Sequence, residues 1–453
     1  MTQKFNVRGC RALSLSVTIS GIIRFLPLYR GAMQKQSLSN ITPLSPLVNA
    51  IWNATGCFFY LGCQWLITVL VVIFSDGFND SGVLAYAMSV GNMFASISLY
   101  KVRTFQVSDI KKEYTSQNYI AFRIITVTIS ACLTVGYLAI MTQSLSTLSS
   151  SLLYLIFKAD ETFNDVLFGI DQCSERMDYI GKSQLLRGAA TLIGFSVPLY
   201  ISGSLHLALI GMATLCILVT LFYDCRVSGR FTEIKPKISK DAALKLAKAC
   251  FFPTLANLFA VSIVSVVRQL YGNIEGETML GIYASIATPA VLIQASAAYL
   301  YSPLIGSLST HLYDYGNTSF RKAFMKMLLL LVGALAVLVC VFSEIGRPAL
   351  ALLYGSDVVS YTWIFPNVLL STAGVGILYF LNDCLIILRD GKTQILMNAS
   401  AFILAIGVST PFFTAFGMNG INLSIELACF FAAAIGLCRI VYLTSHNRGN
   451  KSS

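Results

Sequence analysis

The sequence predicts an all-α membrane protein with about twelve transmembrane helices, arranged as two parallel six-helix halves around a central cavity. Of its 453 residues, 56% are hydrophobic and only 12% are charged, roughly half the charged share of an ordinary soluble domain. Apolar runs near the roughly 20 residues that a helix needs to cross the hydrocarbon core recur along the chain. The Lys and Arg residues gather in alternate loops between these runs, as the topology of a membrane protein requires.

The first 33 residues form a basic N-terminal arm. Its apolar run is interrupted by Arg24 and Pro27, so it is too broken to span a bilayer, and it lacks a small-residue cleavage site. We therefore do not interpret it as a signal peptide. Met33 leads directly into the first span, and we hypothesise that it is the native start, with the preceding residues 1–32 not part of the native chain.

Twelve spans follow, and they divide the chain into two halves. The N-terminal half covers 34–224 and the C-terminal half covers 250–443, joined by a basic cytoplasmic loop over 225–249 and followed by a cytoplasmic tail over 444–453. We expect the spans at about residues 50–74, 82–100, 120–142, 149–170, 186–203, 206–223, 250–271, 279–301, 323–343, 363–387, 394–415 and 421–442.

The orientation follows from the central loop. Residues 225–249 contain seven Lys and Arg against two acidic residues, and a short loop of this kind resists translocation. We place it and both termini on the cytoplasmic side of the cytoplasmic membrane. Asp80 and Tyr86 near the second span match Glu277 and Tyr283 near the eighth at a constant offset of 197 residues, which favours a parallel repeat of six spans.

The fourth span contains four charged residues, Lys158, Asp160, Glu161 and Asp165. At 100° per residue, Lys158, Glu161 and Asp165 share one face, whereas Asp160 points elsewhere. One interpretation is a Lys–Glu pair at i,i+3 that merely neutralises itself. Against it, one Lys cannot neutralise three carboxylates, and the surplus negative charge in a low dielectric suits proton coupling.

Further charges lie within other spans. Arg123 in the third span and Arg268 in the seventh form with Lys158 a predicted ladder of positive charge that suits an anionic substrate, although both Arg side chains could instead snorkel to the interface. Asp383 and Glu426 are lone carboxylates, either cavity groups or helix-packing groups. The candidates for ion coupling are therefore Asp160, Glu161, Asp165, Asp383 and Glu426, and those for substrate binding are Arg123, Lys158 and Arg268.

The sequence lacks the residue patterns that several kinds of catalysis and ligand binding require. Gly181-Lys182-Ser183 misses the earlier glycine of a P-loop. The three histidines, His206, His311 and His446, are scattered and form neither a metal site nor a nucleophile constellation. The cysteines fall mostly in apolar spans as small fillers. We expect no enzyme activity, no catalytic residues, no metal and no cofactor, and the scattered cations exclude a nucleic-acid partner.

Three segments resemble a known family: those from Asn49 to Gly56, from Arg103 to Asp109 and from Gly281 to Ala284. With the charged fourth span and short external loops, residues 34–445 resemble the Wzx-type polysaccharide flippases of the multidrug/oligosaccharidyl-lipid/polysaccharide exporter superfamily. The resemblance implies a V-shaped cavity that opens alternately to each side, in an ion-coupled cycle.

The same resemblance implies the substrate, a polyprenyl-diphosphate-linked oligosaccharide whose lipid tail stays among the membrane lipids while its headgroup crosses. The product would be an exported surface polysaccharide such as O-antigen or capsule. Polysaccharide polymerases and glycosyltransferases are the implied protein partners. Independently of the resemblance, a diphosphate is a double anion with which Lys and Arg can pair.

Three alternatives stay open. A cation-coupled multidrug exporter of the same superfamily would need a net acidic cavity, which the carboxylates of the fourth span allow. A membrane-embedded glycosyltransferase or polymerase commonly needs a large external loop, and no predicted external loop exceeds about twenty residues. A non-transporting scaffold in a cell-wall assembly complex is the third.

Overall fold

The computed structural model describes residues 43–75, 77–109, 112–142, 144–290, 305 and 307–446. The description here concerns the unit Leu44–Ser453. The predicted N-terminal arm and the proposed start at Met33 lie outside the described residues. So do the second half of the eighth span and the last residues of the tail.

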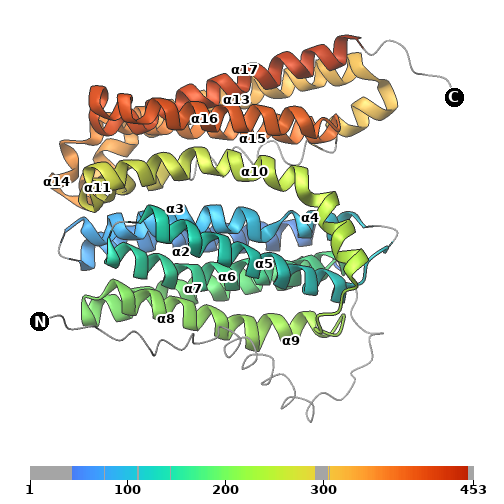
Figure 1. The fold of residues 1–453 in the computed structure, drawn as a ribbon, viewed down its shortest axis with the longest axis horizontal. Helices are drawn as coiled ribbons and strands as arrows, with labels where there is room; N and C mark the ends of the chain where they lie inside the picture. Colours follow the sequence, from blue (N-terminus) through green and yellow to red (C-terminus); the bar gives the residue numbers. More distant parts are fainter. Residues whose placement is uncertain are drawn as a thin grey trace, which may run out of the picture. The chain divides into compact units, whose positions relative to one another are not determined.

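The described chain is almost entirely helical and contains no strand in these ranges (Figure 1). Its main helices are α2 (Pro46–Phe74), α3 (Asn79–Leu99), α4 (Val102–Ser108), α5 (Ser116–Met141), α6 (Leu145–Cys173), α7 (Met177–Ser202), α8 (Leu205–Val219), α9 (Cys225–Ser228), α10 (Lys240–Glu275), α11 (Glu277–Ala287), α13 (Asn317–Tyr354), α14 (Ser356–Val359), α15 (Phe365–Ile387), α16 (Gly391–Phe416) and α17 (Gly420–His446). Short helical turns are η3 (Thr220–Asp224), η4 (Thr288–Ala290), η5 (Thr362–Ile364) and η6 (Gly417–Asn419).

Eleven of the twelve predicted spans fall on these helices, and the described part of the eighth falls on α11 and η4. Within the described residues, nine segments are long and apolar enough to cross a membrane, and one of them, Gly391–Ser445, contains both α16 and α17. Helix α6 does not qualify because its five charged residues lower its hydropathy. Helix α11 does not qualify because its described part is short. The predicted all-α multi-pass architecture is therefore confirmed.

The helix ends explain where several boundaries differ from the prediction. Helix α10 begins at Lys240, inside the predicted basic loop, because the Ser239 side chain accepts a hydrogen bond from the backbone N–H of Ala242 and caps the helix. Helix α7 begins at Met177 and ends at Gly203, whose φ of 62° is accessible to glycine without strain. It therefore starts well before the predicted fifth span, and this brings polar residues into the helix.

Small residues bring the helices of the N-terminal half together. Gly56 of α2 and Gly181 of α7 lie so close that a Cβ atom on either would meet the backbone of the other helix, and Gly194 of α7 faces Gly211 of α8 in the same way. Close backbone approach at small residues is how helices associate without a hydrophobic driving force between them. Large apolar side chains such as Ile140 and Leu352 point outward, as lipid-facing residues do.

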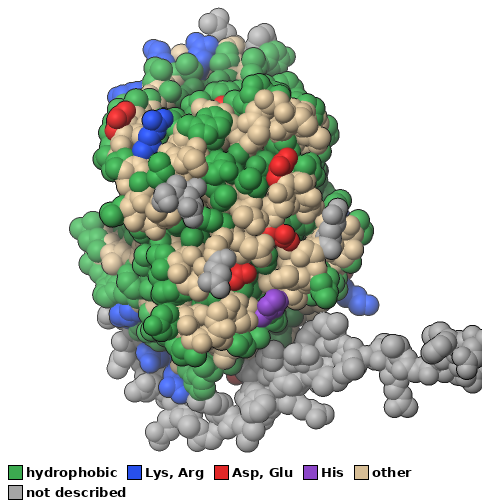
Figure 2. All heavy atoms as spheres, turned by 90° about the vertical axis from the view of Figure 1, so that its left-hand side faces the viewer, with side chains coloured by type: hydrophobic (Ala, Val, Ile, Leu, Met, Phe, Trp, Pro, Cys, Tyr) green, Lys and Arg blue, Asp and Glu red, His purple; other side chains and the backbone are tan. Residues whose placement is uncertain are grey.

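Helix α3 is the element on which the two halves meet. It packs against α5 and α6 of the N-terminal half and against α10 and α11 of the C-terminal half, and it lies beside α10 in Figure 1. Figure 2 faces the end of the helices at which α11 begins, where the surface is mostly hydrophobic or uncharged, with scattered acidic side chains, a histidine and a few Lys or Arg side chains. That this end faces the external side stays a prediction from the loop charges.

Candidate functional site

Helix α6 holds a partly exposed ion pair. Lys158 Nζ lies 2.6 Å from Glu161 Oε2, and the hydroxyl of Tyr60 on α2 donates to Glu161 Oε1 at 3.0 Å. The Lys158 and Glu161 side chains are 16% and 28% exposed, so both are accessible in part. The predicted i,i+3 pair is therefore present. Helix α2 supplies a further hydrogen-bond donor, Tyr60, which could not be predicted from the residue spacing within the fourth span.

One turn further along α6, Asp165 pairs with two arginines. Arg123 of α5 donates from Nη2 to Asp165 Oδ2 at 2.6 Å, and Arg103 of α4 lies 3.4 Å from Oδ1. The Arg123 side chain is completely buried and also donates to the carbonyl of Ser98 at 2.8 Å. Arg123 thus does not snorkel to the interface. It is held inside the N-terminal half by a carboxylate and a backbone oxygen.

Asp160 points to a different neighbour, as predicted, and pairs with a residue that sequence reasoning missed. Arg187 of α7 donates to Asp160 Oδ2 and to Thr220 Oγ1, both at 2.7 Å, and lies 3.9 Å from Asp224. Asp224 ends η3, a single π-helical turn, and accepts a hydrogen bond from the Asn164 amide at 2.9 Å. Single π-helical turns are frequent at functional sites.

These pairs correct one expectation. Each of the three carboxylates predicted in the fourth span has a cation beside it: Lys158 for Glu161, Arg123 and Arg103 for Asp165, and Arg187 for Asp160. The predicted surplus of negative charge in this span was therefore wrong, because the count considered the span alone. A signal was available, since Arg187 lies in an otherwise apolar stretch, but the predicted start of the span near residue 186 placed it at the interface.

The C-terminal half contains a second polar cluster. The guanidinium carbon of Arg268 on α10 lies 5.5 Å from the ring centre of Tyr283 on α11, and the Tyr283 hydroxyl donates to Asn422 Oδ1 of α17 at 2.9 Å. Glu426 lies one turn after Asn422, is 8% exposed, and its Oε1 has no hydrogen-bond partner among the described residues. Asp383 lies half-buried on α15.

The three predicted substrate cations therefore lie in two groups. Arg123 and Lys158 sit in the N-terminal half and each contacts a carboxylate of α6, whereas Arg268 lies on α10 and contacts α11. Among the described residues, Arg268 forms no ion pair, and its Nε has no hydrogen-bond partner. A continuous ladder through all three thus stays a prediction.

The two halves are joined by hydrogen bonds at the end where α11 begins. Thr147 of α6 donates to Glu277 Oε1 of α11 at 2.8 Å, and Tyr137 of α5 donates to Gln269 Oε1 of α10 at 2.6 Å. A cavity of about 240 Å³ adjoins the bond of Thr147 to Glu277; its side-chain lining is polar and uncharged apart from Glu277. The halves are therefore closed against each other at this end.

Comparison with known proteins supports the fold. No protein-family model matches the sequence, and no curated protein matches it. An inward-facing multidrug resistance MATE-family transporter of the MOP superfamily has a TM-score of 0.66 and 11% identity, covering 84% of this chain and 95% of its own. An outward-facing multidrug resistance MATE-family transporter of the same superfamily has a TM-score of 0.58 and 14% identity, covering 92% of this chain and 100% of its own.

A third solved structure is a MOP-superfamily transporter from Pyrococcus furiosus, whose binding pocket is described as having reverse polarity. It has a TM-score of 0.55 and 12% identity, and covers 88% of this chain and 96% of its own. Identities this low show the fold alone. The chain is a multi-pass, all-α membrane protein with the fold of the MATE transporters of the MOP superfamily.

Proposed function

We propose that this protein is a membrane transporter that flips a polyprenyl-diphosphate-linked oligosaccharide across the cytoplasmic membrane by alternating access. The environment of Arg268 is the observation that best supports an anionic substrate. Arg268 lies on a membrane-crossing helix against the face of Tyr283, with no ion pair among the described residues. A charge in the membrane costs about 2.5–3.5 kcal/mol on insertion scales, and such residues mark substrate or ion pathways.

The chemistry of the other interior groups supports the same substrate class. Arg268 can offer a planar fork of donors to a diphosphate. Lys158 is partly exposed and pairs only with Glu161, so an incoming phosphate can replace that carboxylate. Glu161 would then be released to take up a proton or another cation, which would couple transport to an ion. Asp165 and Glu426 are further candidates for this role, and Asp160 and Asp383 complete the predicted set.

Alternating access requires a contact between the halves that can break. The bond of Tyr137 to Gln269 joins two neutral side chains and contributes about 0.5–1.5 kcal/mol, whereas the bond of Thr147 to the Glu277 carboxylate contributes about 1.5–3 kcal/mol. Opening at this end would therefore need these two bonds to break and the packing of α3 against α10 and α11 to loosen, without disrupting the ion pairs inside the N-terminal half.

A cation-coupled multidrug exporter is the second candidate, and one observation favours it. The Glu161 side chain is 28% exposed, more than that of its partner Lys158 at 16%. The more exposed side of this pair is thus the acidic one, which an organic cation could use. The first two structural neighbours are also described as multidrug resistance transporters.

The test is a depletion strain complemented with variants. We expect depletion to accumulate lipid-linked oligosaccharide on the cytoplasmic face and to abolish surface polysaccharide, with wild-type protein restoring both. Arg268→Gln should fail to restore them at an unchanged protein level. Lys245→Gln, which removes an exposed cation from the start of α10, should restore them fully.

Two results would contradict the proposal. Normal surface polysaccharide with Arg268→Gln would remove Arg268 from the substrate path. Unchanged polysaccharide after depletion, together with increased susceptibility to cationic drugs, would favour the exporter.

A further inference from the structure

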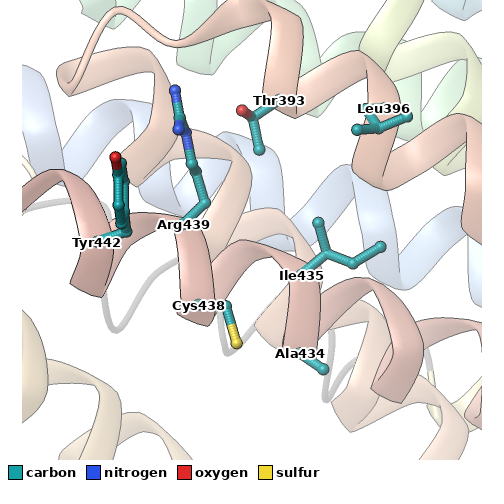
Figure 3. A pocket seen from close by; sticks show the side chains of 7 residues that line it. All are labelled: Thr393, Leu396, Ala434, Ile435, Cys438, Arg439 and Tyr442. Atoms are coloured by element: carbon teal, nitrogen blue, oxygen red, sulfur yellow. The ribbon is translucent and has the colours of Figure 1, made fainter.

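A groove runs between α16 and α17, away from the charged clusters described above. It has a volume of about 670 Å³, within the range of about 300–1,000 Å³ typical of small-molecule sites. Leu396 of α16 and Ala434, Ile435 and Cys438 of α17 form its apolar wall, as Figure 3 shows. No lining residue belongs to the N-terminal half or to the Arg268 cluster.

One end of the groove is polar. Arg439 and Tyr442 of α17 and Thr393 of α16 line it, and Figure 3 shows the Arg439 and Tyr442 side chains side by side. Arg439 lies two turns before the end of α17 at His446, roughly 10 Å along the helix axis. This is the end that we predict to face the cytoplasm, so the polar rim lies at the depth of the lipid headgroups.

Arg439 is only partly used by its protein partner. Its Nε donates to Asp390 Oδ2 at 2.7 Å, its side chain is 39% exposed, and its guanidinium carbon lies 5.6 Å from the Tyr442 ring centre. The two terminal nitrogens donate no hydrogen bond to a described residue. The two terminal nitrogens of the planar Arg439 guanidinium are therefore available at the mouth of the groove, where they could bind a phosphate.

The charge around this rim is positive. Arg389 and Lys392 lie on either side of Asp390 in the turn before α16 and in its first helical residues, and Lys392 is exposed. Two cations thus flank Asp390 in the sequence, and a third, Arg439, is paired with it. Basic sites between transmembrane helices on the cytoplasmic side bind anionic lipid headgroups.

We propose that this groove is a binding site for an anionic phospholipid of the cytoplasmic leaflet. An acyl chain lies along Leu396, Ala434, Ile435 and Cys438, and the phosphate pairs with the free edge of Arg439 and with Lys392. The groove favours a membrane phospholipid over the polyprenyl chain of a transported substrate, because α16 and α17 alone line it. The proposal does not depend on what the protein transports.

The position of Asp390 suggests what the lipid does. Asp390 caps α16 through the backbone N–H of Thr393 and holds Arg439 of α17. A phosphate on the other edge of Arg439 would extend this link between the two helices. A ligand that binds only the folded state stabilises it by mass action, so the anionic lipid should raise the melting temperature.

The experiment compares phosphatidylglycerol with phosphatidylcholine, each titrated into the full-length purified protein in neutral detergent. Native mass spectrometry counts retained lipid, and thermal unfolding follows stability. We expect phosphatidylglycerol to bind more tightly and to raise the melting temperature. Arg439→Ala should weaken its binding at least about tenfold, since a charge-assisted hydrogen bond is lost. Lys245→Ala, an exposed cation elsewhere on this side, should leave it unchanged.

A matched variant separates lipid binding from damage to the helix pair. Asp390→Asn removes the same ion pair as Arg439→Ala but leaves the guanidinium free, so phosphatidylglycerol should bind at least as tightly as to the wild type. Ala434→Trp should fill the groove and reduce the binding of both lipids. Equal losses for Asp390→Asn and Arg439→Ala would overturn the proposal. Equal affinity of the wild type for the two lipids, or an equal loss with Lys245→Ala, would also overturn it.

Discussion

Arg187 should be among the most important residues for the stability of the N-terminal half. It is 3% exposed, donates two hydrogen bonds of 2.7 Å, to Asp160 and Thr220, and also faces Asp224. Arg187→Met keeps the length of the side chain but leaves two buried carboxylates without their cation. Breaking a buried pair in this way costs about 3–5 kcal/mol. We therefore expect the free energy of unfolding to fall by that amount.

The measurement is reversible unfolding in mixed detergent micelles. The triple variant Arg187→Met with Asp160→Asn and Asp224→Asn should regain most of the loss, because replacing a whole buried ionic group is often nearly neutral. Lys182→Met is the control: Lys182 is 43% exposed, and its partner Asp178 keeps Arg176, so the change should cost under about 1 kcal/mol. A loss for Arg187→Met no larger than the control, or no recovery in the triple variant, would refute this reasoning.

Three further predictions test other parts of the fold. Thr147→Val removes the bond to the Glu277 carboxylate and should shift the population toward opening at that end at least about tenfold; unchanged spin-label distances between α6 and α11 would contradict this. Gly181→Ala should cost about 1–3 kcal/mol of unfolding free energy, because its Cβ would meet the backbone of α2, whereas Gly62→Ala, with open space around it, should be neutral or stabilising. Burial raises the pKa of Asp109, but hydrogen bonds from two backbone N–H groups and a tyrosine hydroxyl outweigh it and hold the pKa below its usual value. This contribution is therefore present above about pH 4 and lost as pH falls through the lowered pKa, and a melting-temperature profile of Asp109→Asn should lack that acid-side loss.

The fold could be predicted because it depends on local features. Apolar runs near the length of the hydrocarbon core indicate each span, and loop charges indicate their orientation. Lys158 and Glu161 could also be paired from sequence, since i,i+3 spacing places them on one face of a helix. These inferences need no knowledge of which helices are neighbours.

The partners across helices could not be predicted in the same way. That Arg123 pairs with Asp165, or Tyr60 with Glu161, depends on which helices pack together and at what rotation. Arg187 and Asp224 were missed for a further reason. The spans were bounded where apolar residues begin, whereas a helix begins at its cap and includes polar residues once other helices satisfy them.

The distribution of partners divides the interior cations into two kinds with different expected roles. Arg123 and Arg187 are buried and each is paired with a carboxylate and hydrogen-bonded to a neutral oxygen, so an anion could bind them only by breaking a buried pair at a cost of several kcal/mol. Arg268 has no such competitor among the described residues. Lys158 stands between them, because its single carboxylate partner is itself more exposed than the cation. A substrate anion that moves through this protein could therefore bind Arg268 without displacing a carboxylate, and it could bind Lys158 by displacing Glu161. Arg123 and Arg187 would instead hold the helices in place.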